Sequence, residues 1–133
     1  MKFFLFLFLF TALVRAEITF EISGVRNEGG RIALLVYEKA EGFPDDSEKA
    51  LHRLTQKARK GKILFKIQDL KPGNYAVVVL HDENKNNKID KNFFGYPKEG
   101  FVISNYSKIA RPKFSKAVVK ISKSPVKLKM LYP

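Results

Sequence analysis

The sequence predicts a mainly β protein with about seven antiparallel strands and one short helix. Most of its apolar segments alternate apolar with polar residues, which is typical of strands with one buried face. Clusters of Gly, Pro and Asn separate these segments and mark turns. One segment, residues 45–60, changes to helical spacing. We therefore expect a sheet protein interrupted once by a helix.

The N-terminal sixteen residues are predicted to be a signal peptide. Lys2 supplies a basic start, residues 3–14 are apolar, and Ala16 is a small residue before Glu17, where cleavage is expected. The apolar run is shorter than the roughly 20 residues that span a bilayer, so a retained transmembrane anchor is the less favoured interpretation. We expect an exported protein, periplasmic or extracellular, with a single domain over residues 17–133.

Composition constrains the partners of the exported chain. The chain has no cysteine, so no disulfide can stabilise it. Its 25 Lys and Arg residues against 13 Asp and Glu give a net charge of +12, which becomes +10 once Lys2 and Arg15 are lost. This charge favours anionic partners such as acidic cell-surface glycan or lipopolysaccharide; the alternative is that the scattered lysines serve solubility alone. The absence of an arginine cluster and of an aromatic RNA-binding motif disfavours nucleic acid.

The first two expected strands are predicted to form a hairpin. Residues 18–22 alternate apolar and polar side chains and end at Gly24. Asn27 to Gly30 has the composition of a turn, and Arg31 to Tyr37 is a second, more fully apolar strand. Because the connection is short, we expect the two strands to pair with each other.

Residues 45–60 are predicted to be the helix. Asp45 and Glu48 have the spacing of a capping box at its start, and Gly61 follows as a stop. Ala50, Leu51, Leu54 and Ala58 form a narrow apolar stripe.

The remaining strands follow the same rules. Residues 62–67 alternate again, and Pro72-Gly73 predicts a type II turn in which Gly73 adopts a positive φ. Residues 75–80 are apolar on both faces, which favours a central strand. Further strands are expected at 101–104, 116–121 and 126–131.

The segment that follows the central strand predicts a calcium site. Its oxygen-bearing residues occupy positions 1, 3, 5 and 9 of an EF-hand-type loop, where alternate side chains converge on one cation, and position 7 supplies a backbone carbonyl. These ligands are Asp82, Asn84, Asn86, Asp90 and the carbonyl of Lys88.

The loop departs from a complete EF-hand at two positions. Position 6, usually Gly, is Asn87, and position 12, usually a bidentate Glu, is Phe93. A further carboxylate would have to come from Glu99 or Glu83. The alternative is a polar turn that binds no ion.

Catalytic residues are hard to find in this sequence. His52 and His81 are the only histidines, which disfavours a catalytic zinc site, and there is no cysteine nucleophile. His81 is expected to hydrogen-bond backbone at a strand end. The alternative function is a small hydrolase or isomerase-like enzyme that uses His81, Asp82 and Glu99 at the strand rim. The aromatic run at 92–101 is expected to close the end of the sandwich rather than to form a binding patch.

These motifs jointly resemble a family of exported bacterial proteins known as domain of unknown function 2141. The resemblance is carried by Gly42-Phe43-Pro44, Leu70-x-Pro72-Gly73-x-Tyr75, the loop from His81 to Asp90, Phe94-Gly95-x-Pro97-x-Glu99-Gly100, and Ser104-Asn105. It implies a seven-stranded antiparallel Greek-key β-sandwich of the prealbumin, or transthyretin-like, type. The C-terminal Leu131-Tyr132-Pro133 does not match the tail of transthyretin-like hydrolases, so the likeness does not imply their activity. We therefore expect a non-enzymatic binding or structural module.

Overall fold

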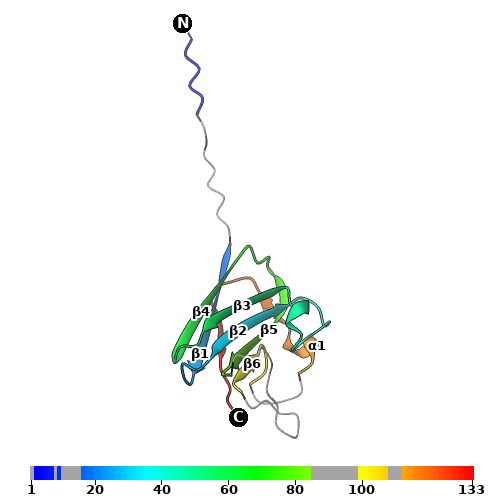
Figure 1. Cartoon of the computed structure of the whole chain (residues 1–133). Helices are drawn as coiled ribbons and strands as arrows, with labels where there is room; N and C mark the ends of the chain where they lie inside the picture. The colour runs from blue at the N-terminus through cyan, green and yellow to red at the C-terminus, as the bar shows by residue number, and fades with distance from the viewer. Residues whose placement is uncertain (1, 8, 10–15, 85–98, 108–111) are drawn as a thin grey trace.

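The computed structural model describes residues 2–7, 9, 16–84, 99–107 and 112–133, which form eight strands in two sheets and one short helix (Figure 1). The prediction of a mainly β protein is confirmed. The elements are β1 (Glu17–Val25), β2 (Arg31–Tyr37), a 3-10 turn η1 (Ser47–Lys49), β3 (His52–Lys57), β4 (Gly61–Gln68), β5 (Gly73–Asp82), β6 (Phe101–Ile103), α1 (Phe114–Ala117), β7 (Val119–Ile121) and β8 (Val126–Lys129).

The smaller sheet has three strands in the order β4-β1-β8. β1 pairs antiparallel with β4, with Phe20 opposite Phe65, and parallel with β8, with Ile22 opposite Leu128. The alternation predicted for residues 18–22 and 62–67 holds, because Phe20 and Phe65 are buried whereas Leu64 is exposed. One face of this sheet is therefore apolar and the other polar.

The larger sheet has five strands. Four strands follow the order β3-β2-β5-β6. The fifth strand, β7, lies on the same side of β5 as β6: β7 pairs with residues 73–75 of β5, and β6 pairs with residues 78–80. β5 is central, as its apolar sequence predicts, with β2 on one side and β6 and β7 on the other.

The main core lies between the two sheets. Eighteen buried residues form it, including Phe20 and Ile22 of the three-stranded sheet and Ile32, Leu34 and Val77 of the five-stranded sheet. These five side chains have no exposed surface. Burying an apolar side chain of this size contributes about 1.5–3 kcal/mol, so the core is the main stabilising term.

A second apolar cluster covers the outer face of the five-stranded sheet. Leu35 and Val78 point to this face and pack with Phe101, Ile103 and Ala117, while Phe43 and Phe114 pack against the same cluster. This second cluster explains why β5 is apolar on both faces.

The predicted Greek-key order and hairpin are wrong. The described residues form eight strands rather than seven, β1 and β2 lie in different sheets, and β8 pairs with β1 in parallel. The alternation in β1 and β2 identifies one buried face on each, but two such faces can meet across the core as well as lie side by side in one sheet. The turn itself is present: the Asn27 side chain accepts a hydrogen bond from the backbone N–H of Gly29 at 2.9 Å.

The predicted helix over residues 45–60 is also wrong. Asp46 caps only the 3-10 turn η1, accepting from the N–H of Glu48 at 3.1 Å, and residues 52–57 form the edge strand β3 instead. Tertiary pairing with β2 overrides the weak helical stripe, because β3 places Leu54 opposite the buried Leu34.

The turn before β5 differs from the predicted type II geometry. Asp69, at φ 60°, has the left-handed conformation, and Gly73 does not. Gly73 instead lies beside the ring of Tyr75, which a Cβ would meet at 3.4 Å, and the Tyr75 hydroxyl donates to the carbonyl of Lys71 at 2.6 Å. The Pro-Gly-x-Tyr motif therefore anchors a tyrosine over the turn, comparable to the tyrosine corners of other β proteins.

The N-terminal apolar residues stand apart from the sheets. In Figure 1 residues 2–7, drawn in dark blue, lie far from both sheets. Phe3 to Leu7 and Leu9 are 72–90% exposed. Within the described ranges, none of the helices is long and apolar enough to cross a membrane.

Candidate functional site

The end of β5 and the residues just before β6 lie side by side. Leu80 pairs with Phe101, and the N–H of His81 donates to the carbonyl of Gly100 at 2.8 Å. Asp82 is the last residue of β5, and Glu99 lies two residues before β6. Both residues are buried, at 4% and 9% exposure. Because Asp82 follows His81 and Glu99 precedes Gly100, these two predicted ligands flank the last hydrogen bond between the two segments.

Arg31 supplies a counter-charge for Asp82. In the β2–β5 ladder Arg31 is the cross-strand neighbour of Asp82, and its Nε lies 3.5 Å from the carboxylate Oδ2. The Asp82 side chain is only 6% exposed, so this ion pair is little screened by solvent. A carboxylate has about four lone-pair positions, which lets Asp82 face both Arg31 and a further ligand.

The structure brings together some of the predicted ligands and leaves others undescribed. Asn84 is exposed, two residues beyond Asp82. Asn86, Lys88 and Asp90 lie outside the described residues. Among the residues that are described, no three Asp, Glu, His or Cys side chains cluster as a metal site would require.

Glu83, the other carboxylate considered as a ligand, has a different set of neighbours. Its Oε1 accepts hydrogen bonds from Arg26, at 2.9 Å from Nε and 2.5 Å from Nη2. The structure therefore favours Glu99 over Glu83 as the additional carboxylate near Asp82.

His81 belongs to a buried network beneath this site. Its side chain has no exposed surface. Nε2 lies 2.6 Å from the carbonyl of Gly29, which can only accept, so Nε2 carries the proton. Nδ1 then accepts from the Tyr132 hydroxyl at 2.8 Å, and that oxygen accepts from the N–H of Arg26 at 3.1 Å. Both nitrogens of His81 are thus occupied, and its backbone partner lies in the β1–β2 connection rather than in the loop that follows β5.

Tyr132 connects three distant parts of the chain at this site. Its ring lies against Gly100, where an added Cβ would be 2.2 Å from the ring, and the Arg26 guanidinium lies 4.5 Å from the ring centroid. Burial raises the pKa of the Tyr132 hydroxyl, and the Glu83 charge adds to this effect. The hydroxyl therefore stays protonated and can donate to His81.

Glycine packing fixes the same end of β5 from the other side. Gly30 has φ 67°, and a Cβ there would lie 2.0 Å from the Asp82 carbonyl oxygen. Only glycine allows the β1–β2 connection to approach the backbone of Asp82 so closely. The close contact with Gly30 therefore fixes the backbone position of Asp82, the first of the predicted ligands.

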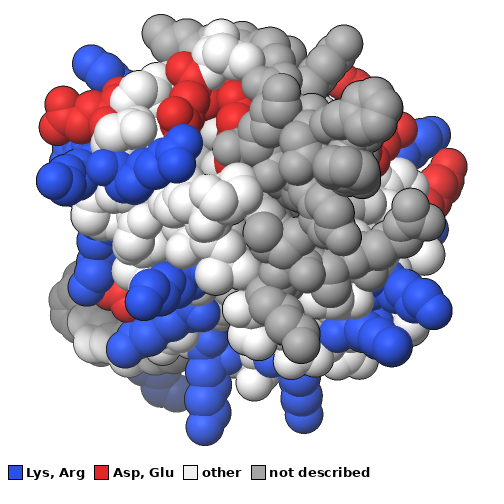
Figure 2. Space-filling model, turned by 90° about the horizontal axis from the view of Figure 1, so that it is seen from below, with Lys and Arg blue, Asp and Glu red and all other residues white. Residues whose placement is uncertain are grey.

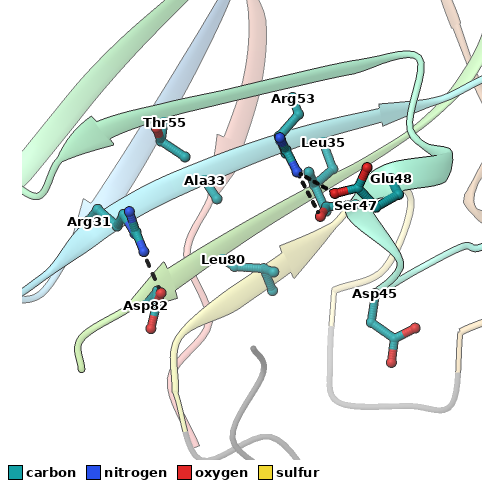
Figure 3. Close-up of a pocket in the computed structure, with 10 residues that line it drawn as sticks. All are labelled: Arg31, Ala33, Leu35, Asp45, Ser47, Glu48, Arg53, Thr55, Leu80 and Asp82. Atoms are coloured by element: carbon teal, nitrogen blue, oxygen red, sulfur yellow. Dashed lines mark hydrogen bonds and ion pairs between the residues drawn. The ribbon is translucent and has the colours of Figure 1, made fainter. Parts of the chain in front are cut away.

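An open cavity of about 360 Å³ lies next to Asp82 on the outer face of the five-stranded sheet. Figure 3 shows the Arg31–Asp82 pair at one end and Arg53, with Ser47 and Glu48, at the other. Arg53 Nη1 lies 3.2 Å from Ser47 Oγ and 3.3 Å from Glu48 Oε1. The remaining lining residues are Ala33, Leu35, Asp45, Thr55 and Leu80.

Sequence reasoning missed the partners that shape the site. Arg31 and Tyr132 carry no motif and lie far along the chain from the residues that they contact, His81 and Tyr132 being 51 positions apart. Arg53 contacts Ser47 and Glu48, six and five positions away, but within a segment that was predicted to be a helix. The alternation of β2 could have placed Arg31 on the outer face, but not beside Asp82. His52 lies in the same segment and is half-buried in β3 opposite Val36.

Ser104 and Asn105 of the family motif have structural roles. The buried Ser104 hydroxyl donates to the carbonyl of Ala117 at 2.6 Å and accepts from the N–H of Val77 at 2.9 Å. Asn105, at φ 66°, donates to the carbonyl of Lys116 at 3.0 Å. The pair joins the end of β6 to α1 and β5. Most of the aromatic run at 92–101 lies outside the described residues, and Phe101 is buried in the second apolar cluster.

Fold and site together define a mainly β protein of two sheets with two buried carboxylates at the ends of neighbouring strands. The chain belongs to the family described as "Uncharacterized protein conserved in bacteria (DUF2141)", whose model matches residues 20–129. This span includes Asp82 and Glu99, and it confirms the family resemblance seen in the sequence. Searches of the curated proteins and of the solved structures found no match.

Proposed function

We propose that this protein is an exported, non-enzymatic binding or structural module that binds calcium through residues 82–90. The ligands would be the side chains of Asp82, Asn84, Asn86 and Asp90, the carbonyl of Lys88, and the carboxylate of Glu99. Calcium takes 6–8 oxygen ligands, so this set reaches the number that it requires.

The observation that carries the proposal is the β5–β6 register. Together with the hydrogen bond from His81 to Gly100, it brings the buried Asp82 and the buried Glu99 to the same end of β5 and β6. Two buried like charges close together are unfavourable, and Arg31 supplies one positive charge beside Asp82. A divalent cation held by both carboxylates would add two more. Glu99 would then replace the bidentate Glu that position 12 lacks.

Calorimetric titration with calcium tests this site. The unmodified protein should bind one calcium ion, and Asp82→Asn or Asp90→Asn should abolish most of the binding heat, because each removes a charged ligand and keeps its shape. Asp69→Asn is the matched control: it changes the same charge at a residue outside the loop. If Asp69→Asn weakens binding as much as Asp82→Asn, the effect comes from overall charge and the loop is not the site.

The geometry of His81 supports a binding module over the hydrolase or isomerase-like alternative. A general base must reach the proton that it removes. His81 is fully buried, both of its nitrogens are occupied, and it is not among the residues that line the cavity. Of the three residues considered for catalysis, Asp82 alone lines that cavity.

Export is proposed from the basic start, the apolar segment and the small residue before Glu17. The exposed apolar side chains of residues 3–7 and 9 are consistent with a segment that is removed. Intact-mass measurement of the exported protein should give a chain that begins at Glu17, and a chain that keeps Met1 would contradict the proposal.

We propose a prealbumin-like relationship only for the packing of two sheets against each other, because the strand order differs.

A further inference from the structure

The outer face of the three-stranded sheet carries an excess of positive charge. We define the lysine face as the outward-pointing residues of β1, β4 and β8, and none of them is buried. Four lysines lie on it against two glutamates. The residues are Glu17, Thr19, Glu21, Ser23, Lys62, Leu64, Lys66, Gln68, Lys127 and Lys129.

The two glutamates are held within the face and neutralise only part of its charge. Glu21 pairs with Lys62 at 2.9 Å, and this hydrogen bond keeps the pKa of Glu21 below its usual value. Glu17 lies 4.0 Å from Lys66 and accepts from Gln68. Counted by formal charge, the four lysines exceed the two glutamates by two.

The cavity on the five-stranded sheet has a small excess of acidic residues. The cavity on the five-stranded sheet is lined by two arginines and by the carboxylates of Asp45, Glu48 and Asp82. Figure 2 shows the uneven distribution: Lys and Arg project from the lower part of the view, whereas most visible Asp and Glu lie in the upper part. The net charge of +12 is thus not spread uniformly.

We propose that the lysine face binds an acidic polysaccharide. This deepens the proposed function, on which it rests for the export of the chain, and it does not require the calcium site. Lys62 and Lys66 are about 13 Å apart along β4, and β8 lies roughly 10 Å from β4 across the sheet. Lys127 and Lys129 are about 7 Å apart along β8. The pair on β8 and each lysine of β4 are thus separated by more than the Debye length of about 8 Å, so the charge is spread over the face and suits a partner with repeated, separated anionic groups. A polymer of acidic sugars does so.

Two further features favour a polysaccharide over the phosphates of lipopolysaccharide. The face has no arginine, the side chain that binds phosphate through a bidentate fork. Leu64, 46% exposed, lies on β4 between Lys62 and Lys66, where it can contact the apolar C–H surface of a sugar ring.

Binding of polygalacturonate, measured by calorimetry in the presence of a chelator, tests this proposal. A variant with Lys62, Lys66, Lys127 and Lys129 each changed to Gln should bind at least about tenfold more weakly and lose most of its salt dependence. The matched control changes four exposed lysines elsewhere to Gln, namely Lys39, Lys60, Lys71 and Lys113. It should bind within about threefold of the unmodified protein, because only long-range charge is lost.

Three results would overturn the proposal. They are equal weakening by both four-lysine variants, tight binding of inorganic polyphosphate without binding of polygalacturonate, or no binding of either polymer. If the four-lysine face variant does not fold, a double variant on the edge strand β8, Lys127→Gln with Lys129→Gln, replaces it. Its control is Lys39→Gln with Lys60→Gln. If the β8 variant binds polygalacturonate no more weakly than this control, the proposal is also overturned. The chelator separates this result from calcium binding, so either proposal can fail alone.

Discussion

Changing Tyr132 to Phe should destabilise the protein by about 2–4 kcal/mol. The substitution keeps the ring that lies against Gly100 but removes the hydroxyl that donates to His81 Nδ1 at 2.8 Å and accepts from the Arg26 N–H at 3.1 Å. Each lost hydrogen bond costs about 0.5–1.5 kcal/mol net, and a buried acceptor left without a partner costs about 1–3 kcal/mol. The second term applies because His81 is fully buried.

Urea denaturation with linear extrapolation measures this loss, and Tyr106→Phe is the control. The Tyr106 hydroxyl accepts one exposed hydrogen bond, from the N–H of Lys113 at 2.9 Å, so its removal should cost less than about 1 kcal/mol. If Tyr132→Phe costs no more than Tyr106→Phe, the network does not hold the site together and our account of His81 is refuted.

Three further predictions concern glycine packing, alkaline pH and the calcium ligands. Gly30→Ala should prevent folding or lower the free energy of unfolding by more than about 3 kcal/mol in urea denaturation, because the added Cβ would overlap the Asp82 backbone. Gly61→Ala is the control: Gly61 also has a positive φ but faces open space, so this change should cost about 1–2 kcal/mol. Burial, with nearby Asp45 and Asp46, raises the pKa of Tyr37 well above 10. The folded state therefore keeps the hydroxyl proton to a higher pH than the unfolded state, and the free energy of unfolding should fall as the pH rises above 10. Tyr37→Phe should make this fall smaller when stability is compared between pH 9 and about 11. Glu99→Gln should weaken calcium binding at least about tenfold in titration calorimetry, and unchanged affinity would exclude Glu99 as a ligand.

The parts of the fold that the sequence predicted correctly are those encoded by local alternation. β4 and the central β5 could be located because their inward residues, such as Ile63 and Val77, alternate or run continuously with apolar neighbours. β3 could not be located, because as an edge strand it has no fully buried residue and its weak apolar pattern also fits a helix. Its conformation is decided by hydrogen bonds to β2, which depend on the tertiary structure.

Pairing between distant segments was the other source of error. The sequence shows that β1 and β2 each have a buried face, and it cannot show whether these faces meet across a core or lie in one sheet. The same limit applies to the site. Asp82 and Glu99 could be selected as carboxylates near the loop, but Arg31 reaches Asp82 only through strand pairing and Tyr132 reaches His81 only through C-terminal packing.

Thermal unfolding with calcium and with chelator tests the central claim most directly. For a dissociation constant on the order of 10 μM, 1 mM calcium is about a hundredfold excess and stabilises the folded protein by roughly 2.7 kcal/mol. For a chain near this size that corresponds to an increase in melting temperature of about 8 °C or more. We predict this increase for the unmodified protein and its loss in Asp82→Asn. Superimposable melting curves of the unmodified protein with calcium and with chelator would contradict the account.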